Sequence, residues 1–249
     1  MTPPRLLLAG VLVLVVVVGG YVAYDQVLSG DSVAPLTLPS TSPEAAASSA
    51  APSDASGASA EPTTSTSGDI AGTWVVAGDS QAGYRVRERL ASLAAESDAV
   101  GRTSDVTGSI TLERSGSTTT LTAGTLTVDT TTIVSDEDRR DNRLRTEGLQ
   151  TDTYQTASFT LTGPVEIPAS ALEGTATDLT LVGDLELHGV TRSVSIPAQA
   201  RLVDGTIQVA GSITFLLLDF EIEPPNVGGF ILSIADEGAL EFAVNFTRT

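Results

Sequence analysis

Residues 183–198 read GDLELHGVTRSVSIPA, and their pattern determines the fold class. Apolar residues take alternate positions on both sides of His188-Gly189: Leu185, Leu187, Val194, Ile196 and Ala198. Successive side chains of a strand point to opposite faces, so this alternation places the apolar residues on one buried face. The stretch therefore predicts two half-buried antiparallel strands with a hairpin turn at His188-Gly189.

The same alternation recurs through the C-terminal part of the chain. It is clearest at Ile110 and Leu112, Leu126 and Val128, Phe159 and Leu161, Ile207 and Val209, Ile213 and Phe215, and along Leu240, Phe242, Val244 and Phe246. Turn-forming residues separate the runs, and Ser115-Gly116-Ser117, Asp204-Gly205 and Asp236-Glu237-Gly238 each predict a hairpin. About eight or more strands joined by short turns predict an all-β barrel or sandwich.

Two segments have helical character instead. Residues 88–97, with the sequence ERLASLAAES, are the first. Residues 135–149 are the second, and they open with Ser135-Asp136-Glu137-Asp138. Ser135 is expected to cap this helix, and the acidic residues complement its dipole. A short helical segment therefore accompanies the predicted strands.

The N-terminus predicts a membrane anchor over residues 1–24. The run from residue 6 to residue 24 carries no charge and spans roughly 28 Å as a helix, close to the hydrocarbon thickness of a bilayer. Arg5 precedes it, which predicts that the N-terminus stays in the cytoplasm and that the rest is exported. The expected location is thus the cell membrane, with one pass and an extracytoplasmic C-terminal domain. A cleaved signal peptide is the alternative.

Residues 25–68 predict a disordered tether. They are mostly Ala, Ser, Pro and Thr, with almost no large apolar residue after Leu38, so they cannot bury enough surface to offset the entropy of ordering. As a flexible coil this segment would reach roughly 36 Å from the membrane. Residues 69–249 have the length and apolar content of one domain with a substantial core.

The charge and cysteine content narrow the class of protein. The formal net charge is −18, and all 13 basic residues are arginines. An acidic surface without lysine argues against binding to nucleic acid or to anionic headgroups, and it is typical of a soluble exported domain. The chain has no Cys, so disulfides and a lipidated N-terminal cysteine are excluded.

Residues suited to catalysis or metal binding are scarce. With one His and no Cys, nucleophilic triads and multi-histidine metal sites are excluded or badly handicapped. His188 is interpreted as a solvated turn residue, with a haem or metal ligand as the alternative. Asp136, Glu137, Asp138 and Asp141 do not match a calcium-binding loop, and we interpret them as acids that balance the neighbouring arginines. We expect neither an enzyme nor a cofactor.

Several motifs occur in the order typical of one family. Trp74 lies in the opening strand, residues 140–146 read RDNRLRT, and Phe159 lies in the strand that follows. Residues 183–192 match the pattern G-x-L-x-x-x-G-V-T-R, and residues 219–222 read DFEI where the family motif is D-F-G-I. From residue 72 to residue 246, the chain thus resembles the YceI-like family, the lipid- or polyisoprenoid-binding domain of bacterial envelopes.

The resemblance implies an extended eight-stranded, lipocalin-like antiparallel barrel whose lumen holds the apolar chain of an isoprenoid lipid. Eight strands leave room for filling side chains or one small ligand. Candidate lumen residues are Tyr84, Val86, Phe159, Leu161, Phe215, Phe230, Leu232 and Phe242. Ordinary core packing is the alternative for each of them. Candidate ligands for a pyrophosphate or quinone head group are Arg140, Arg143 and Arg145, with internal ion pairs to the interleaved acids as the alternative.

The sequence therefore predicts a membrane-tethered, exported binding protein that carries, stores or sequesters an isoprenoid or related apolar lipid. The rival hypothesis is an envelope structural or interaction module with a packed barrel and no lipid. A continuous apolar void would favour the first hypothesis, and a core closed by Phe and Leu side chains would favour the second. An enzyme would instead need a polar pocket with two convergent acids or acid–arginine pairs.

Overall fold

The computed structural model describes residues 33–39, 70–90, 96–224 and 231–249. The predicted anchor, residues 1–24, lies outside them, as does most of the predicted tether, residues 25–68. Among the helices of this described part, none is long and apolar enough to cross a bilayer.

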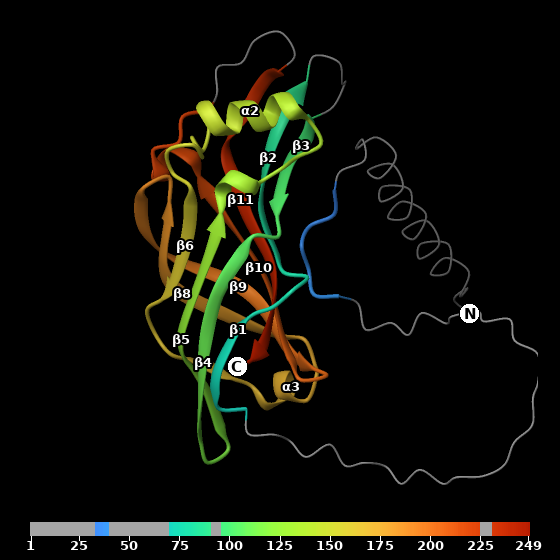
Figure 1. Ribbon diagram of the computed structural model, residues 1–249, viewed down its shortest axis with the longest axis vertical. Coiled ribbons are helices and arrows are strands. Elements are labelled where there is room, and N and C mark those ends of the chain that lie inside the picture. The colour runs from blue at the N-terminus through green and yellow to red at the C-terminus, as the bar shows by residue number, and fades with distance from the viewer. Residues whose placement is uncertain (1–32, 40–69, 91–95, 225–230) are drawn as a thin grey trace, which may run out of the picture.

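Eleven strands of the described residues form a single antiparallel sheet (Figure 1). They are β1 (Gly72–Val76), β2 (Gln81–Leu90), β3 (Glu96–Thr103), β4 (Val106–Ser115), β5 (Thr118–Asp129), β6 (Thr156–Leu161), β7 (Val165–Ile167), β8 (Thr177–Leu187), β9 (Val190–Val203), β10 (Thr206–Leu216) and β11 (Ile231–Arg248). The predicted all-β class is confirmed.

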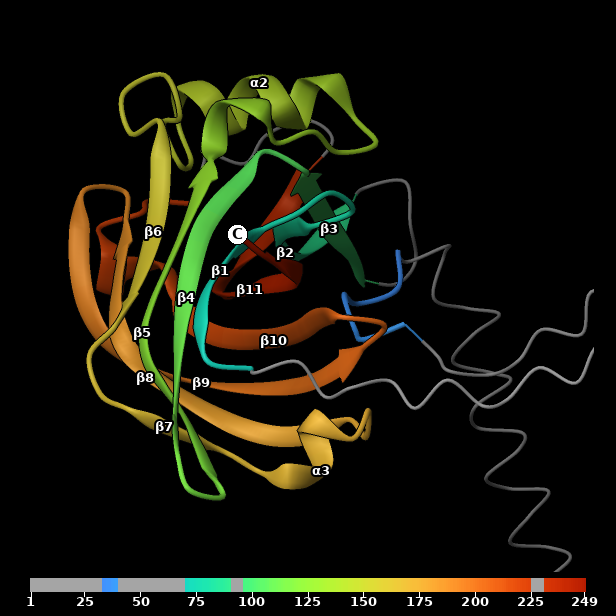
Figure 2. The same cartoon turned by 60° about the horizontal axis from the view of Figure 1, so that its bottom comes forward.

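Eight of the described strands close into a barrel. Each pairs with the next in the order β1, β4, β5, β6, β8, β9, β10 and β11, and β1 pairs with β11 to complete the ring. On β1, Trp74 lies opposite Ile110 of β4 on one side and opposite Arg248 of β11 on the other. Strands β2 and β3 extend the sheet from β11, and β7 pairs with β5. Figure 2 shows the ring of strands from nearer its end.

Two helices mark the ends of this barrel. Helix α2 (Asp138–Thr146) lies across one end, which we call the upper end, and α3 (Ala169–Leu172) lies at the opposite, lower end (Figure 1). Two 3₁₀ turns, η1 (Thr130–Thr132) and η2 (Leu217–Phe220), follow β5 and β10. Helix α2 confirms the helix predicted within residues 135–149.

The start of α2 differs from the prediction. Glu137 is the N-cap residue and makes no capping hydrogen bond with its side chain, so the predicted cap by Ser135 is wrong. Instead, Ser135 donates its main-chain N–H and its hydroxyl to Asp141, at 3.0 and 2.6 Å. The other predicted helix, residues 88–97, is also wrong at its described ends, because residues 88–90 belong to β2 and residues 96–97 to β3.

Three predicted hairpin turns are confirmed and one is wrong. Ser115-Gly116-Ser117 joins β4 to β5. His188-Gly189 joins β8 to β9, and Asp204-Gly205 joins β9 to β10; all four residues have positive φ, as a two-residue turn of this type requires. Asp236-Glu237-Gly238 lies inside β11, where the register against β2 shifts between Ile234 and Gly238. This is an irregularity within a long strand, which retains its pairing on both sides.

The core lies on the inner face of the barrel. Leu112 on β4 and Val244 and Phe246 on β11 are buried there, as the alternation predicts. Trp74 is also buried, and its indole N–H donates to the Ile70 carbonyl at 3.1 Å. A second cluster of buried apolar residues gathers around Phe220 of η2.

Candidate functional site

The barrel lumen contains a main cavity of ≈ 170 Å³, lined almost entirely by apolar side chains. The lining includes residues of β2 and of β11, which pair directly although they are far apart in the sequence. Four of the predicted lumen residues line this cavity: Tyr84, Phe159, Leu161 and Phe242. Ala171 and Leu172 of α3 mark its lower end.

Small residues on the inner face contribute to this space. Gly124, Ala157 and Ala200 line the cavity at positions where the strand pattern places an inward side chain. A Cβ atom at Gly124 would lie 3.5 Å from Ile110 Cγ2 and 3.7 Å from Leu161 Cβ, which is ordinary van der Waals contact. The backbone at Gly124 therefore tolerates a side chain directed into the cavity.

A second cavity of ≈ 100 Å³ lies at the upper end, beneath α2. Val86 and Phe215, two further predicted lumen residues, line it together with Arg140 and Arg143 of α2. Tyr84, Leu149 and Leu240 line both cavities. The two spaces are therefore neighbours along the lumen, with these three side chains between them.

The upper cavity contains a buried ion pair. Arg140 of α2 contacts Glu88 of β2 at 2.7 Å, and the Glu88 side chain is only 3% exposed. Arg140 also pairs with Asp136, one turn earlier in sequence. Burial lowers the pKa of Arg140, but the hydrogen bonds and charges of Glu88 and Asp136 outweigh it and hold the pKa above its usual value. The guanidinium is therefore charged and already partnered.

Two buried donors beside this ion pair have no partner among the described residues: the Tyr84 hydroxyl and the Arg140 Nε. Desolvation by burial raises the pKa of Tyr84 well above its usual range, against the opposing effect of the Arg140 charge. The phenol thus keeps its proton and remains a donor. Buried donors normally find an acceptor, so a ligand oxygen in the upper cavity that reached either donor would satisfy it.

His188 occupies the predicted turn, but the interpretation as a solvated residue is wrong. It is 7% exposed, its Nδ1 lies 3.0 Å from the Phe220 carbonyl, and its ring packs on Tyr154 with centroids 4.2 Å apart. The carbonyl is an acceptor, so Nδ1 carries the proton. No group of three or more metal-ligating side chains occurs in the described part of the chain.

The remaining predicted site residues are placed less centrally or lie outside the described part. Arg145 lines neither cavity and donates to Asn142 within α2. Phe230 lies outside the described residues, and so does the side chain of Leu232. The prediction missed Glu88 because its partner Arg140 is 52 positions away in sequence. Leu240, in contrast, belongs to the apolar alternation, and that pattern could have identified it as a lumen residue.

Comparison with known protein families matches residues 74–246 of the chain to the YceI-like domain. No curated protein matches the chain.

Two solved structures are among those similar to the chain. A polyisoprenoid-binding domain from Saccharophagus degradans, implicated in plant cell wall breakdown, is 18% identical over 72% of this chain and 99% of that chain, with a TM-score of 0.55. BcnA from Burkholderia cenocepacia is 14% identical over 67% of this chain and 95% of that chain, with a TM-score of 0.49. The first of these agrees with the barrel described above.

Proposed function

The chain belongs to the YceI-like family, and from this premise we propose that it binds an apolar lipid of the isoprenoid type inside its barrel. The similar domain from Saccharophagus degradans is described as polyisoprenoid-binding, which supports this ligand class. The observation that carries the proposal is the pair of neighbouring cavities, a larger apolar one and a smaller one with charged residues.

The main cavity suits the tail of such a lipid. Its ≈ 170 Å³ is similar to an apolar cavity of about 150 Å³ that stays dry and binds benzene. Each buried CH₂ group contributes about 0.8 kcal/mol, so even a part of an isoprenoid chain gains several kcal/mol on entering. A longer chain requires Tyr84, Leu149 and Leu240 to move apart and join the two cavities.

The upper cavity suits the polar end of the lipid. The Tyr84 hydroxyl and the Arg140 Nε both lack an acceptor, and both are donors. A hydroxyl, a quinone carbonyl or a phosphate would supply one. Arg143 also lines this cavity and is the best remaining head-group candidate, whereas Arg145 lines neither cavity.

We place this binding protein at the cell membrane, held by residues 1–24, with its barrel on the extracytoplasmic side. In that setting it would carry, store or sequester its lipid without changing it covalently. The net charge of the chain, −18, is mostly carried by residues 69–249 and favours a barrel that stays soluble and unattached to anionic headgroups.

Native mass spectrometry of the full chain, released from detergent micelles after expression in a lipid-containing host, tests the proposal. We expect a stoichiometric adduct that extracts into organic solvent as a prenyl chain. Gly124→Leu places a side chain in the main cavity and should abolish the adduct. Ala123→Leu adds the same side chain at the neighbouring exposed position and should retain it.

A clean apo mass, with no binding of added polyprenyl phosphates or isoprenoid quinones, would contradict lipid binding. The structural or interaction module with a packed barrel would then be the better hypothesis. An adduct of equal amount in Gly124→Leu would place the lipid outside the main cavity.

A further inference from the structure

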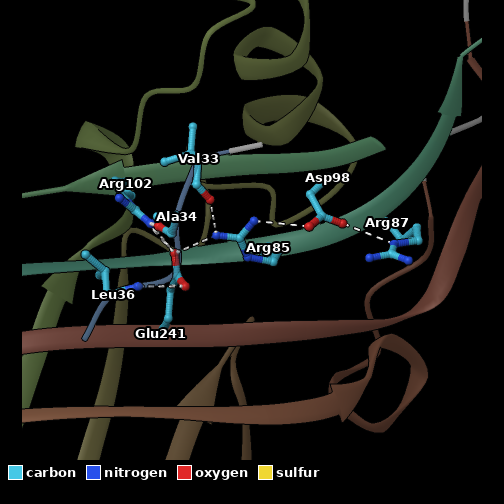
Figure 3. A network of polar contacts seen from close by, with 8 residues as sticks. All are labelled: Val33, Ala34, Leu36, Arg85, Arg87, Asp98, Arg102 and Glu241. Carbon is cyan, nitrogen blue, oxygen red and sulfur yellow. Dashed lines mark hydrogen bonds and ion pairs between the residues drawn. The ribbon is translucent and has the colours of Figure 1, made fainter. Parts of the chain in front are cut away.

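A cluster of charged residues lies on the outer face of β2, β3 and β11 (Figure 3). We call Arg85, Arg87, Asp98, Arg102 and Glu241 the outer cluster. Arg102 contacts Glu241 at 2.8 Å, and Arg85 contacts Glu241 at 3.6 Å and Asp98 at 3.1 Å. Strand alternation places these side chains on the outer face, since Arg85 lies between the inward-facing Tyr84 and Val86. Arg85 and Glu241 also border the upper and the main cavity, respectively.

Glu241 is buried although strand alternation places its side chain on the outer face. Its side chain is 3% exposed, less than those of Arg85 and Arg102 beside it, which are 16% and 23% exposed. Gly83 lies between Arg102 and Glu241 in the register of the three strands. A Cβ atom there would come within 2.9 Å of Arg102 Cγ, so the glycine lets the arginine cross the strand to reach Glu241.

The segment of residues 33–39, part of the predicted tether, contacts three members of this cluster. Arg85 donates to the Val33 carbonyl at 2.7 Å, and Arg102 donates to the Ala34 carbonyl. In the opposite direction, the Leu36 N–H donates to Glu241 at 3.2 Å. Figure 3 shows these three contacts on one side of β2 and β3.

A fourth contact extends the binding surface to β9 and β10. Arg201 is 6% exposed and donates to the Pro39 carbonyl at 2.6 Å and to the Gln208 side chain at 2.8 Å. Among the described residues its recorded partners are these two neutral oxygens. The carbonyl of Pro39 therefore supplies an acceptor that a buried guanidinium needs.

All four contacts involve the main chain of residues 33–39. Three arginines donate hydrogen bonds to carbonyl oxygens, and one glutamate accepts a hydrogen bond from an N–H group. Pro35 and Pro39 suit this surface because proline lacks an N–H that would need a partner and has a restricted φ. The surface is thus built for an extended peptide, with charge-assisted hydrogen bonds at both ends of the segment.

We propose that the outer cluster, together with Arg201, is a peptide-binding site whose occupant is residues 33–39 of the same chain. Binding there latches the barrel close to the residues that precede Val33. Residues 40–69, whose contour length is roughly 100 Å, then no longer add to the distance between that N-terminal part and the barrel. Glu241 and Arg201 also border the main cavity, but neither belongs to the residues proposed to contact the lipid.

Paramagnetic relaxation in the isotopically labelled full chain tests the latch. The chain has no Cys, so Thr37→Cys offers one site for a nitroxide at an exposed position of the segment. We expect loss of the Arg102 and Glu241 amide signals by broadening. The amide of Thr127 on β5 should stay sharp and report that the barrel is folded.

Leu36→Pro removes the N–H that Glu241 accepts, and in the labelled chain it should restore the lost signals. Leu38→Pro is the matched control, because the Leu38 N–H donates no hydrogen bond within the described part of the chain, and it should leave the broadening in place. Sharp Arg102 and Glu241 signals without any proline substitution would overturn the proposal. Broadening seen only when the nitroxide is carried by a second, isotopically unlabelled copy would also overturn it.

Discussion

The two cavities of the barrel differ in the kind of side chain that lines them. The main cavity is bounded mainly by apolar side chains that need no partner, so most of its lining tolerates exchange among residues of similar volume. The upper cavity contains Glu88 and Arg140, each of which depends on the other for its burial. One barrel thus combines a space defined by shape with a space defined by specific polar contacts.

Among the substitutions considered, removing the charge of Glu88 is expected to destabilise the protein most. Glu88→Gln leaves the buried Arg140 with only Asp136 as a charged partner, and we expect the free energy of unfolding to fall by roughly 3 kcal/mol. Urea denaturation measures this. Glu113→Gln, at an exposed position of β4, should change it by less than about 0.5 kcal/mol. If Glu88→Gln and Glu113→Gln lowered the free energy of unfolding equally, the upper cavity would not depend on the contact between Glu88 and Arg140.

Tyr84 joins the two cavities, and Tyr84→Phe tests whether its hydroxyl acts on a ligand. We expect a polyprenol to bind about tenfold more weakly, the equivalent of one hydrogen bond, and squalene, which has no oxygen, to bind equally well. The apo protein should not lose stability, because the hydroxyl has no partner there. Tyr154→Phe, in a residue that lines neither cavity, is the control.

If Tyr84→Phe weakens the binding of squalene and of the polyprenol equally, the polar end of the ligand does not lie at the junction of the two cavities. Isothermal titration with both lipids distinguishes the two outcomes.

A smaller change in stability is expected from relieving the backbone strain at Glu221. Glu221 has φ 56° and ψ 27°, a left-handed conformation that favours glycine, and the family motif has glycine there. Glu221→Gly should stabilise the protein by about 0.5–1 kcal/mol in urea denaturation. Glu223→Gly, at an exposed neighbour without positive φ, should not stabilise it. Destabilisation by Glu221→Gly would mean that the side chain makes a compensating contribution.

The strands of the barrel were predictable because the alternation of apolar and polar residues lies within each strand. Alternation at Ile110 and Leu112, and again along Leu240, Phe242 and Val244, places those residues inside the ring, where the structure has them. Period-two spacing needs no knowledge of which strand is the neighbour. The family motifs then supplied the closure into eight strands, which spacing alone leaves open between a barrel and a sandwich.

Polar features inside and outside the barrel were not predictable in the same way. Glu88 interrupts an inward-facing series that alternation would fill with apolar residues, and its burial depends on the distant Arg140. The helix predicted for residues 88–97 failed for a related reason, since pairing of β2 with β3 and β11 overrides local preference. Composition likewise assigned residues 33–39 to a tether, although their main chain contacts the outer cluster.

The ring closes where the first barrel strand meets the last, and this affects how the protein is made. Trp74 to Val76 of β1 pair with Phe246 to Arg248 of β11, so the closing contact joins segments that are synthesised first and last among the described strands. Until β11 emerges, β1 and β10 each have an unpaired edge. A growing chain therefore has an interval of exposure to wrong pairing that ends only with its final strand.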